Sequence, residues 1–276
     1  MIVEVGSFLY FVLLFVCVGL TVGLYFLLRN KTDKTKKIVL FSILAFNFLL
    51  HFSRVFYMNT ADFLCAVSFN NICATSVVFF PFIFLSKSDT WKDYMVYIGM
   101  LSGAATMLYP EGVLGSDMTY FDNWRFYICH MLLFVVSCLI VVLKVHKLNY
   151  HRIWKMPFCF LFMYLIIMVN TVLTSELGLS TPRGTDLQVP YNNESLVWYP
   201  DRVAGSILSV FVPDFLKHVP FGEHAGEAKY WPFLWIVCPV FIAAFVGCFL
   251  LSLPFEWRHV KEDFVSLKAK FQKNKE

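Results

Sequence analysis

Residues 124–145 read WRFYICHMLLFVVSCLIVVLKV, a stretch long enough to cross a bilayer as one helix. A membrane helix needs about 20 mostly apolar residues to span the hydrocarbon core. The polar side chains Arg125 and His130 lie near its beginning, and the rest is almost entirely aliphatic or aromatic up to Lys144. Because charged and imidazole side chains are costly in hydrocarbon, this asymmetry predicts a membrane helix that is polar toward one end.

Windows of the same kind recur along the whole chain. Of the 276 residues, 58% are hydrophobic and only 15% are charged, against about 25% charged in a soluble domain. We therefore predict an all-α, multi-pass protein of the cell membrane, a bundle of seven transmembrane helices. The expected spans lie near residues 6–28, 37–58, 62–86, 94–110, 124–145, 156–176 and 231–253.

Lysine and arginine predict the orientation of this bundle. Of the 23 basic residues, 17 fall in the segments 29–37, 86–93, 144–155 and 258–276, which lie on one side of a seven-span chain. Since cytoplasmic loops are rich in these residues, we predict the N-terminus outside and the C-terminus in the cytoplasm. The formal charge of +4 is then explained by membrane flanks, and we expect no nucleic-acid partner.

The chain is expected to form one membrane domain, residues 1–258, followed by a basic cytoplasmic tail, residues 259–276. A long outer loop covers 177–230, and its apolar part, 203–217, is too short and too broken by proline to span. We expect that part to lie at the interface. All eight cysteines fall inside predicted spans, so a disulfide framework in the outer loops is not expected.

Polar residues gather in the outer halves of four predicted spans, whereas the inner halves are almost purely apolar. In hydrocarbon each such side chain needs a partner or a function. The pattern therefore predicts a polar cavity in the outer half of the bundle. Its expected members are Asn47, His51 and Arg54 on one helix face, Ser68, Asn70, Asn71, Cys73, Thr75 and Ser76, then His130, and finally Asn170, Thr171 and Thr174.

The cavity residues suggest nucleophilic chemistry at a thiol. A cysteine reacts as its thiolate and needs a base or a positive neighbour. Cys73 is the candidate nucleophile, and His130 is the candidate base that takes its proton. Side-chain amides can stabilise a developing oxyanion, and the candidates for that role are Asn70, Asn71 and Asn170.

Two other interpretations use the same residues. His51, Cys73 and His130 are three potential zinc ligands, although the fourth ligand would have to be an amide or water and no paired motif prearranges them. His51 and Arg54, also candidates for substrate binding, are instead typical of an interhelical hydrogen-bond network. We favour the network for these two residues and expect no metal and no cofactor.

Several short motifs resemble the YwaF-like family of integral membrane proteins, in order and spacing, over roughly residues 40–256. That family is similar to the eukaryotic transmembrane protein 164. The motifs are Asn71-Ile72-Cys73, Gly99-Met100-Leu101-Ser102-Gly103-Ala104, Leu108-Tyr109-Pro110, Phe126-Tyr127-Ile128-Cys129-His130, Asn170, Trp231-Pro232 and Leu253-Pro254-Phe255.

The resemblance implies a lipid acyltransferase that uses a cysteine thioester assisted by histidine. Phospholipid and lysophospholipid would then be the partners, with Cys73 as nucleophile and His130 as base. The chain departs from the family pattern beside the cysteine, where relatives often have histidine and this sequence has Asn71 and Ala74.

Two functions without catalysis compete with this expectation. A seven-helix receptor or lipid-binding protein has the same topology and a cavity open to the outside, but the sequence has no mid-span lysine in the seventh window and no outer cysteine pair. A transporter or scramblase is less favoured, because the sequence contains no inverted repeat and no paired broken helices.

Overall fold

The computed structural model describes residues 2–178, 196–200 and 202–273, and all longer regular elements in these ranges are helices. Five helical segments are long and apolar enough to cross a membrane. The expectation of an all-α membrane protein is therefore confirmed. These segments are Phe8–Leu28, Asp33–Phe56, Phe121–Val142, Tyr150–Glu176 and Leu234–Ser266.

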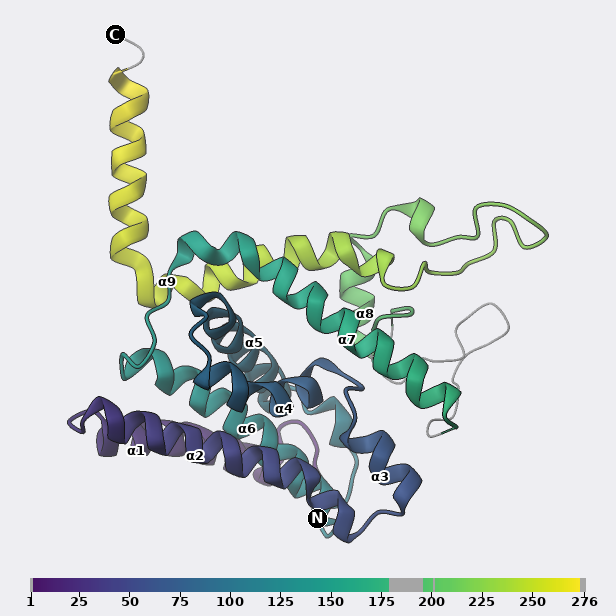
Figure 1. The fold of residues 1–276 in the computed structure, drawn as a ribbon, viewed down its shortest axis with the longest axis horizontal. Coiled ribbons are helices and arrows are strands. Elements are labelled where there is room, and N and C mark those ends of the chain that lie inside the picture. Colours follow the sequence, from purple (N-terminus) through teal and green to yellow (C-terminus); the bar gives the residue numbers. More distant parts are fainter. Residues whose placement is uncertain (1, 179–195, 201, 274–276) are drawn as a thin grey trace.

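Two helices packed against each other, α5 (Asp89–Leu108) and α6 (Phe121–Val142), form the centre of the bundle. The pair α1 and α2 covers one side of this centre, and α7 lies beside α9 on the other side (Figure 1). The bounds of these outer helices are Phe8–Leu28 for α1, Asp33–Phe52 for α2, Met156–Glu176 for α7 and Leu234–Lys273 for α9.

Glycine allows α5 and α6 to approach closely. A Cβ atom at Gly99 would collide with the hydroxyl of Ser137, and one at Gly103 would lie 2.6 Å from Cβ of Phe134. Small residues spaced four apart are typical of tight helix packing in membranes. Gly99 and Gly103 have this spacing and this role here.

The outer helices leave large apolar side chains uncovered. On α1, Phe8 is 84% exposed, and Phe15 and Leu27 are also exposed. A contiguous apolar surface of this kind is rare on soluble monomers. In a membrane, acyl chains cover it, so exposure on α1 is consistent with a position at the lipid-facing edge of the bundle.

The third predicted span, 62–86, is not one helix. It is two helices, α3 (Thr60–Val67) and α4 (Ile72–Leu85), separated by residues 68–71. The side chain of Asn71 accepts a hydrogen bond from Ala74 N at 2.9 Å and starts α4. Asparagine and serine compete for backbone hydrogen bonds and favour helix starts. The polar residues of this span therefore interrupt it.

Helix α5 also differs from its predicted window, 94–110. It begins five residues earlier, at Asp89, and contains Lys92 and Asp93 in its first turns. It is absent from the five long apolar segments. The helix is nevertheless largely buried, because α4, α6 and α7 surround it.

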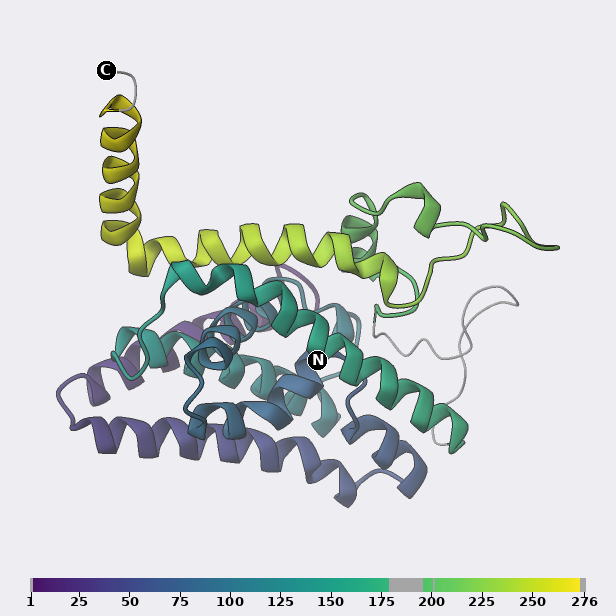
Figure 2. The same ribbon diagram turned by 45° about the horizontal axis from the view of Figure 1, so that its top comes forward.

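The last helix continues beyond the window 231–253. Helix α9 runs from Leu234 to Lys273 and contains Pro239 and Pro254. The C-terminal part of this helix changes direction sharply and projects away from the bundle (Figure 2). A proline inside a helix removes one hydrogen bond and bends the axis. The expected basic tail is thus largely a helical extension of the seventh span.

The described part of the outer loop contains short elements at the other end of α9. Helix α8 (Arg202–Ser209) packs against α9, and a 3-10 turn follows at Asp214–Leu216. The indole Nε1 of Trp235 donates to the carbonyl of Val197 at 3.0 Å. The apolar part, 203–217, is therefore too broken to span, as expected, while loop residues 179–195 lie outside the described ranges.

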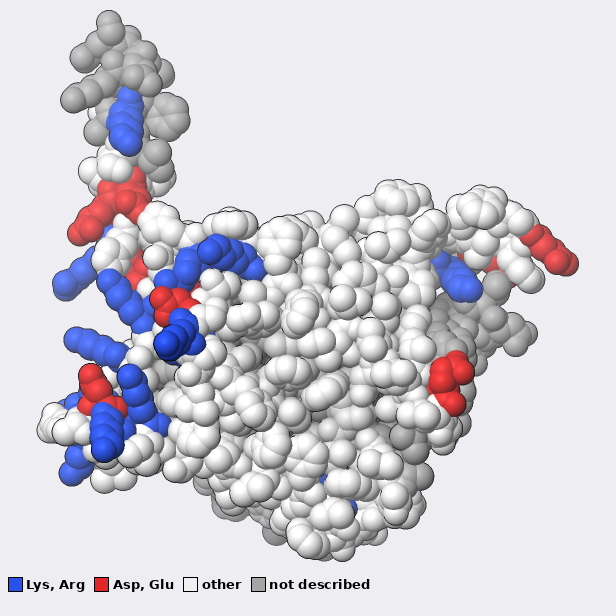
Figure 3. Space-filling model, in the orientation of Figure 1, with Lys and Arg blue, Asp and Glu red and all other residues white. Residues whose placement is uncertain are grey.

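Charged residues are unevenly distributed over the bundle. In Figure 3 most of the visible lysine and arginine gathers at the end where the C-terminal part of α9 departs, and the middle of the face is uncharged. We call this the basic end. It matches the expectation that basic loops share one side of the chain.

Candidate functional site

The break between α3 and α4 is held by two side chains of the α2 region. Nη1 of Arg54 donates to the carbonyl of Ala66 at 2.5 Å, and Nε2 of His51 lies 3.1 Å from the carbonyl of Val67. A carbonyl only accepts, so Nε2 of His51 carries the proton. The last carbonyls of a helix have no partner within it, and hydrocarbon offers none. Arg54 and His51 supply those partners.

A charged cluster lies next to this break. Asp122, at the start of α6, accepts from Nε of Arg125 at 2.6 Å, from Nε of Arg54 at 3.1 Å and from the hydroxyl of Tyr57 at 2.8 Å. Two guanidinium groups share one carboxylate, so these three side chains carry one net positive charge. Sequence reasoning missed Asp122 because it precedes the apolar window 124–145. Its i, i+3 spacing from Arg125 was the available signal.

The predicted amide residues meet around the same break. Nδ2 of Asn170 on α7 donates to Oγ of Ser68 at 3.2 Å, and this hydroxyl donates to Oδ1 of Asn70 at 3.2 Å. Asn71 caps α4. The structure therefore brings Asn70, Asn71 and Asn170 to one region and links α7 to the interruption between α3 and α4.

Cys73 is the second residue of α4, and its side chain faces the interior of the bundle. It lies beside Ser102 on α5 and near Tyr164 on α7. Because Asn71 ends the interruption, the thiol stands in the first turn of a helix, where the backbone partial charge is positive.

His130 lies on α6 with one ring nitrogen already engaged. Nδ1 is 2.7 Å from the carbonyl of Phe126, so Nδ1 carries the proton and donates it. The ring also packs on the ring of Phe126, with centroids 4.3 Å apart. In the neutral imidazole this leaves Nε2 with a lone pair that can accept a proton.

Cys73 and His130 approach the same part of α5 from two sides. Cys73 lies beside Ser102, and a Cβ at the next residue, Gly103, would be 2.9 Å from the backbone carbonyl of His130. Within the described part of the chain the two side chains form no hydrogen bond with each other. A contact between the Cys73 thiol and the His130 imidazole therefore stays a prediction.

The structure also shows a contact that sequence reasoning missed. Nη1 of Arg125 lies 3.8 Å from Sγ of Cys129, one turn further along α6. Cys129 is buried and has a guanidinium neighbour, which Cys73 does not. In the part of the chain that the structure describes, no group of three or more His, Cys, Asp or Glu side chains is placed to hold a metal ion. The zinc interpretation of His51, Cys73 and His130 has no support in this geometry.

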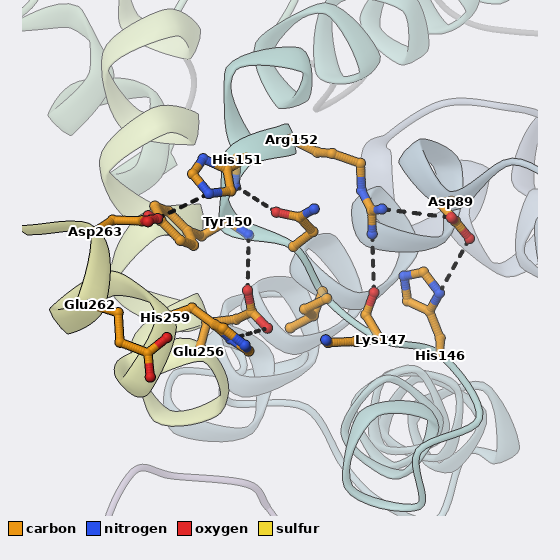
Figure 4. Close-up of a pocket in the computed structure, with 12 residues that line it drawn as sticks. Asp89, His146, Lys147, Tyr150, His151, Arg152, Glu256, His259, Glu262 and Asp263 are labelled. Atoms are coloured by element: carbon orange, nitrogen blue, oxygen red, sulfur yellow. Dashed lines mark hydrogen bonds and ion pairs between the residues drawn. The ribbon is translucent and has the colours of Figure 1, made fainter. Parts of the chain in front are cut away.

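A second polar site lies at the basic end (Figure 4). It is a cavity of about 380 Å³ between the start of α5, the segment 146–152 and α9. Asp93 is fully buried there and is 2.6 Å from Nε2 of His146 and 2.5 Å from Nε of Arg152. Asp89 extends the cluster. These ion pairs hold the connection between α6 and α7 onto α5.

Comparison with known proteins matches most of the chain to a protein family. A family model described as the TMEM164 family matches residues 4–251, which include Cys73, His130 and all the other predicted site residues. No curated protein and no solved structure matches the chain significantly. The matched range confirms the family suggested by the short motifs.

Proposed function

The chain belongs to the TMEM164 family, and we propose that it moves a fatty acyl chain from a phospholipid to a lysophospholipid through a thioester on Cys73. The observation that carries this proposal is the interrupted third span. It creates a helix start inside the bundle, puts Cys73 in the first turn, and brings the amides Asn70, Asn71 and Asn170 to the same break.

The start of α4 is suited to an oxyanion. In the described part of the chain the backbone N–H groups of Ile72 and Cys73 have no hydrogen-bond acceptor, because Asn71 engages those of Ala74 and Thr75. Free N–H donors at a helix start favour negative charge. They support a role in stabilising the tetrahedral intermediate, together with the three amides.

In the first half-reaction Nε2 of His130 takes the proton from the Cys73 thiol. The thiolate attacks the ester carbonyl carbon of the phospholipid, a C–S bond forms, and the bond from that carbon to the glycerol oxygen breaks. The imidazolium returns its proton to the departing oxygen, and a lysophospholipid leaves. The lone pair on Nε2, secured by the bond from Nδ1 to Phe126, supports this assignment.

In the second half-reaction the hydroxyl of another lysophospholipid gives its proton to Nε2 of His130. Its oxygen attacks the thioester carbonyl, the C–S bond breaks, and the proton passes to the sulfur of Cys73. Both steps need closer approach of thiol and imidazole than in the free protein. Catalytic hydrogen bonds often tighten only when substrate is bound.

The charged cluster is suited to the lipid phosphate. Arg54 and Arg125 share Asp122 and leave one positive charge close to the break. Guanidinium groups bind phosphate through directed hydrogen bonds. In this proposal Arg54 positions the phosphate while His51, bonded to Val67, keeps the helix break in place.

We also propose that the chain crosses the membrane seven times, with its N-terminus outside. The five long apolar segments are joined by α4, which is apolar but shorter, and by the buried α5. The basic end would then face the cytoplasm, and the break with Cys73 would face the outer leaflet of the cell membrane.

The test is acyl transfer by the purified chain in mixed micelles. Phosphatidylcholine is the donor, an isotope-labelled lysophospholipid is the acceptor, and labelled diacyl product is measured. Cys73→Ala should reduce transfer to background. His130→Asn, whose amide can still donate to the Phe126 carbonyl, should lower the rate by about 10²–10⁴-fold, the usual contribution of a general base.

Cys129→Ala is the matched control, because Cys129 is a second thiol inside the bundle and directly precedes His130. It should retain transfer and a hydroxylamine-sensitive acyl group detectable on Cys73 by mass spectrometry. Transfer that survives Cys73→Ala and is lost in Cys129→Ala would disprove the assignment of Cys73 as nucleophile.

A further inference from the structure

The C-terminal part of α9, residues 256–273, runs across the direction of the long helices of the bundle. We call this segment the tail helix. It begins at the basic end, just after Pro254, and extends beyond the edge of the bundle (Figures 1 and 2). Helices that cross a bilayer lie close to its normal. A helix that runs across them at their basic end therefore lies along the membrane surface.

Contacts at the cavity of the basic end hold the tail helix in this direction. Glu256 accepts from the backbone N–H of Tyr150 at 3.4 Å. Asp263, two turns later, accepts from the hydroxyl of Tyr150 and lies 3.0 Å from Nε2 of His151 (Figure 4). Two attachment points seven residues apart fix both the position and the rotation of the helix about its axis.

This rotation leaves an apolar face uncovered. Apolar residues recur at intervals of three and four, which places them on one face of a helix. The side chains of Trp257 and Phe264 on this face are 59% and 71% exposed. The full series in the sequence is Trp257, Val260, Phe264, Leu267 and Phe271.

The basic residues near this face indicate that an anionic lipid surface covers it. Lys261 lies beside the apolar series on the helix, and the sequence from residue 256 onward contains six lysines and arginines against four acidic residues. Helices with an apolar face, interfacial tryptophan and flanking basic residues bind anionic lipid surfaces. Uncovered Leu250 and Phe255 precede the tail helix on α9, so a lipid-facing surface leads directly to it.

We propose that the tail helix lies in the headgroup layer of the leaflet at the basic end, with Trp257 and Phe264 toward the acyl chains and its lysines on anionic phospholipids. It is a docking surface for the membrane itself, and not for a second copy of the chain. The segment lies beyond residues 4–251, the family-matched range, and its membrane binding does not depend on acyl transfer.

The experiment is hydrogen–deuterium exchange of residues 256–273, with the whole chain in detergent, in phosphatidylcholine nanodiscs and in phosphatidylcholine nanodiscs containing phosphatidylserine. Exchange in the discs with phosphatidylserine should be on the order of tenfold slower than in detergent, and high salt should reduce this protection. Phe264→Glu should remove the protection, because it puts a charge on the apolar face.

Val265→Glu is the matched control. Val265 is 58% exposed but lies about 100° further round the helix, off the apolar face, so the variant should keep at least half of the protection. Equal exchange in detergent and in both kinds of disc would overturn the proposal. Protection in detergent that rises with protein concentration would also overturn it, because it would identify a second copy as the partner.

Discussion

Asp122 shows how a single polar residue organises the polar contacts around the break between α3 and α4. Its carboxylate accepts hydrogen bonds from Arg54, Arg125 and Tyr57. Arg54 also donates a hydrogen bond to the carbonyl of Ala66 at the end of α3. A charge in hydrocarbon persists only when it is paired. The carboxylate therefore allows two arginines to stay beside the helix break, where one of them also completes the backbone hydrogen bonding.

We expect Asp122→Asn to destabilise the protein, because it leaves the buried guanidinium of Arg125 and the partly buried one of Arg54 without their counter-charge. The free energy of unfolding should fall by about 1–3 kcal/mol, the usual cost of unpaired buried polar groups. The measurement is the thermal midpoint in detergent. Asp33→Asn is the control, since Asp33 is 79% exposed in its pair with Lys36, and its midpoint should stay within experimental error.

At the scale of elements, the α5–α6 pair determines how closely the two catalytic candidates can approach. Gly103 lies against Phe134 and against the backbone of His130, while the preceding residue, Ser102, lies beside Cys73. The separation of these helices thus controls the position of the imidazole relative to the thiol. The packing motif is structural, but its position connects it to the proposed chemistry.

Gly103→Ala should therefore push α6 away from α5. We expect a loss of stability of about 1–3 kcal/mol, typical of overpacking, and a fall in acyl transfer that exceeds the loss of folded protein. Thermal midpoint and transfer rate are measured together. Gly247→Ala on α9 is the control, because its Cβ would meet no atom within 4 Å. If both alanine variants behave alike, close α5–α6 packing does not position His130.

At the scale of the whole molecule, charge and helix direction divide the protein into two ends. The break, Cys73 and the amide cluster occupy one end, while Asp93, its partners His146 and Arg152, and the tail helix occupy the other. Beside the cavity at the basic end, the connection 146–152 contacts α9. These contacts determine where the tail helix leaves the bundle. We propose chemistry on lipids at the first end and attachment to the membrane surface at the second.

Topology is the prediction at this scale. With seven crossings, epitope tags at the two termini should lie on opposite sides of the membrane, the C-terminal tag on the cytoplasmic side with the basic end. Antibody labelling of intact and permeabilised cells measures this. Labelling of both tags from the same side would give an even number of crossings and contradict the proposed orientation of Cys73 toward the outer leaflet.

Sequence patterns anticipated a large part of the fold and several of its polar contacts. Five of the seven apolar windows, and the hydrogen-bond network expected for His51 and Arg54, correspond to features of the structure. Asp122 escaped notice because an aspartate just ahead of an apolar window resembles a loop residue. Nothing local in the sequence states that its partner lies 68 positions earlier, at Arg54.

The amino-acid sequence by itself determined that this chain crosses a membrane as helices, because the length and apolarity of each window are local properties that hydrocarbon selects directly. Only the tertiary structure decided that 62–86 breaks at residues 68–71, that the C-terminal part of α9 turns aside, and that Cys73 and His130 flank the same turn of α5. These outcomes depend on which polar group meets which across neighbouring helices, and on their rotation and register.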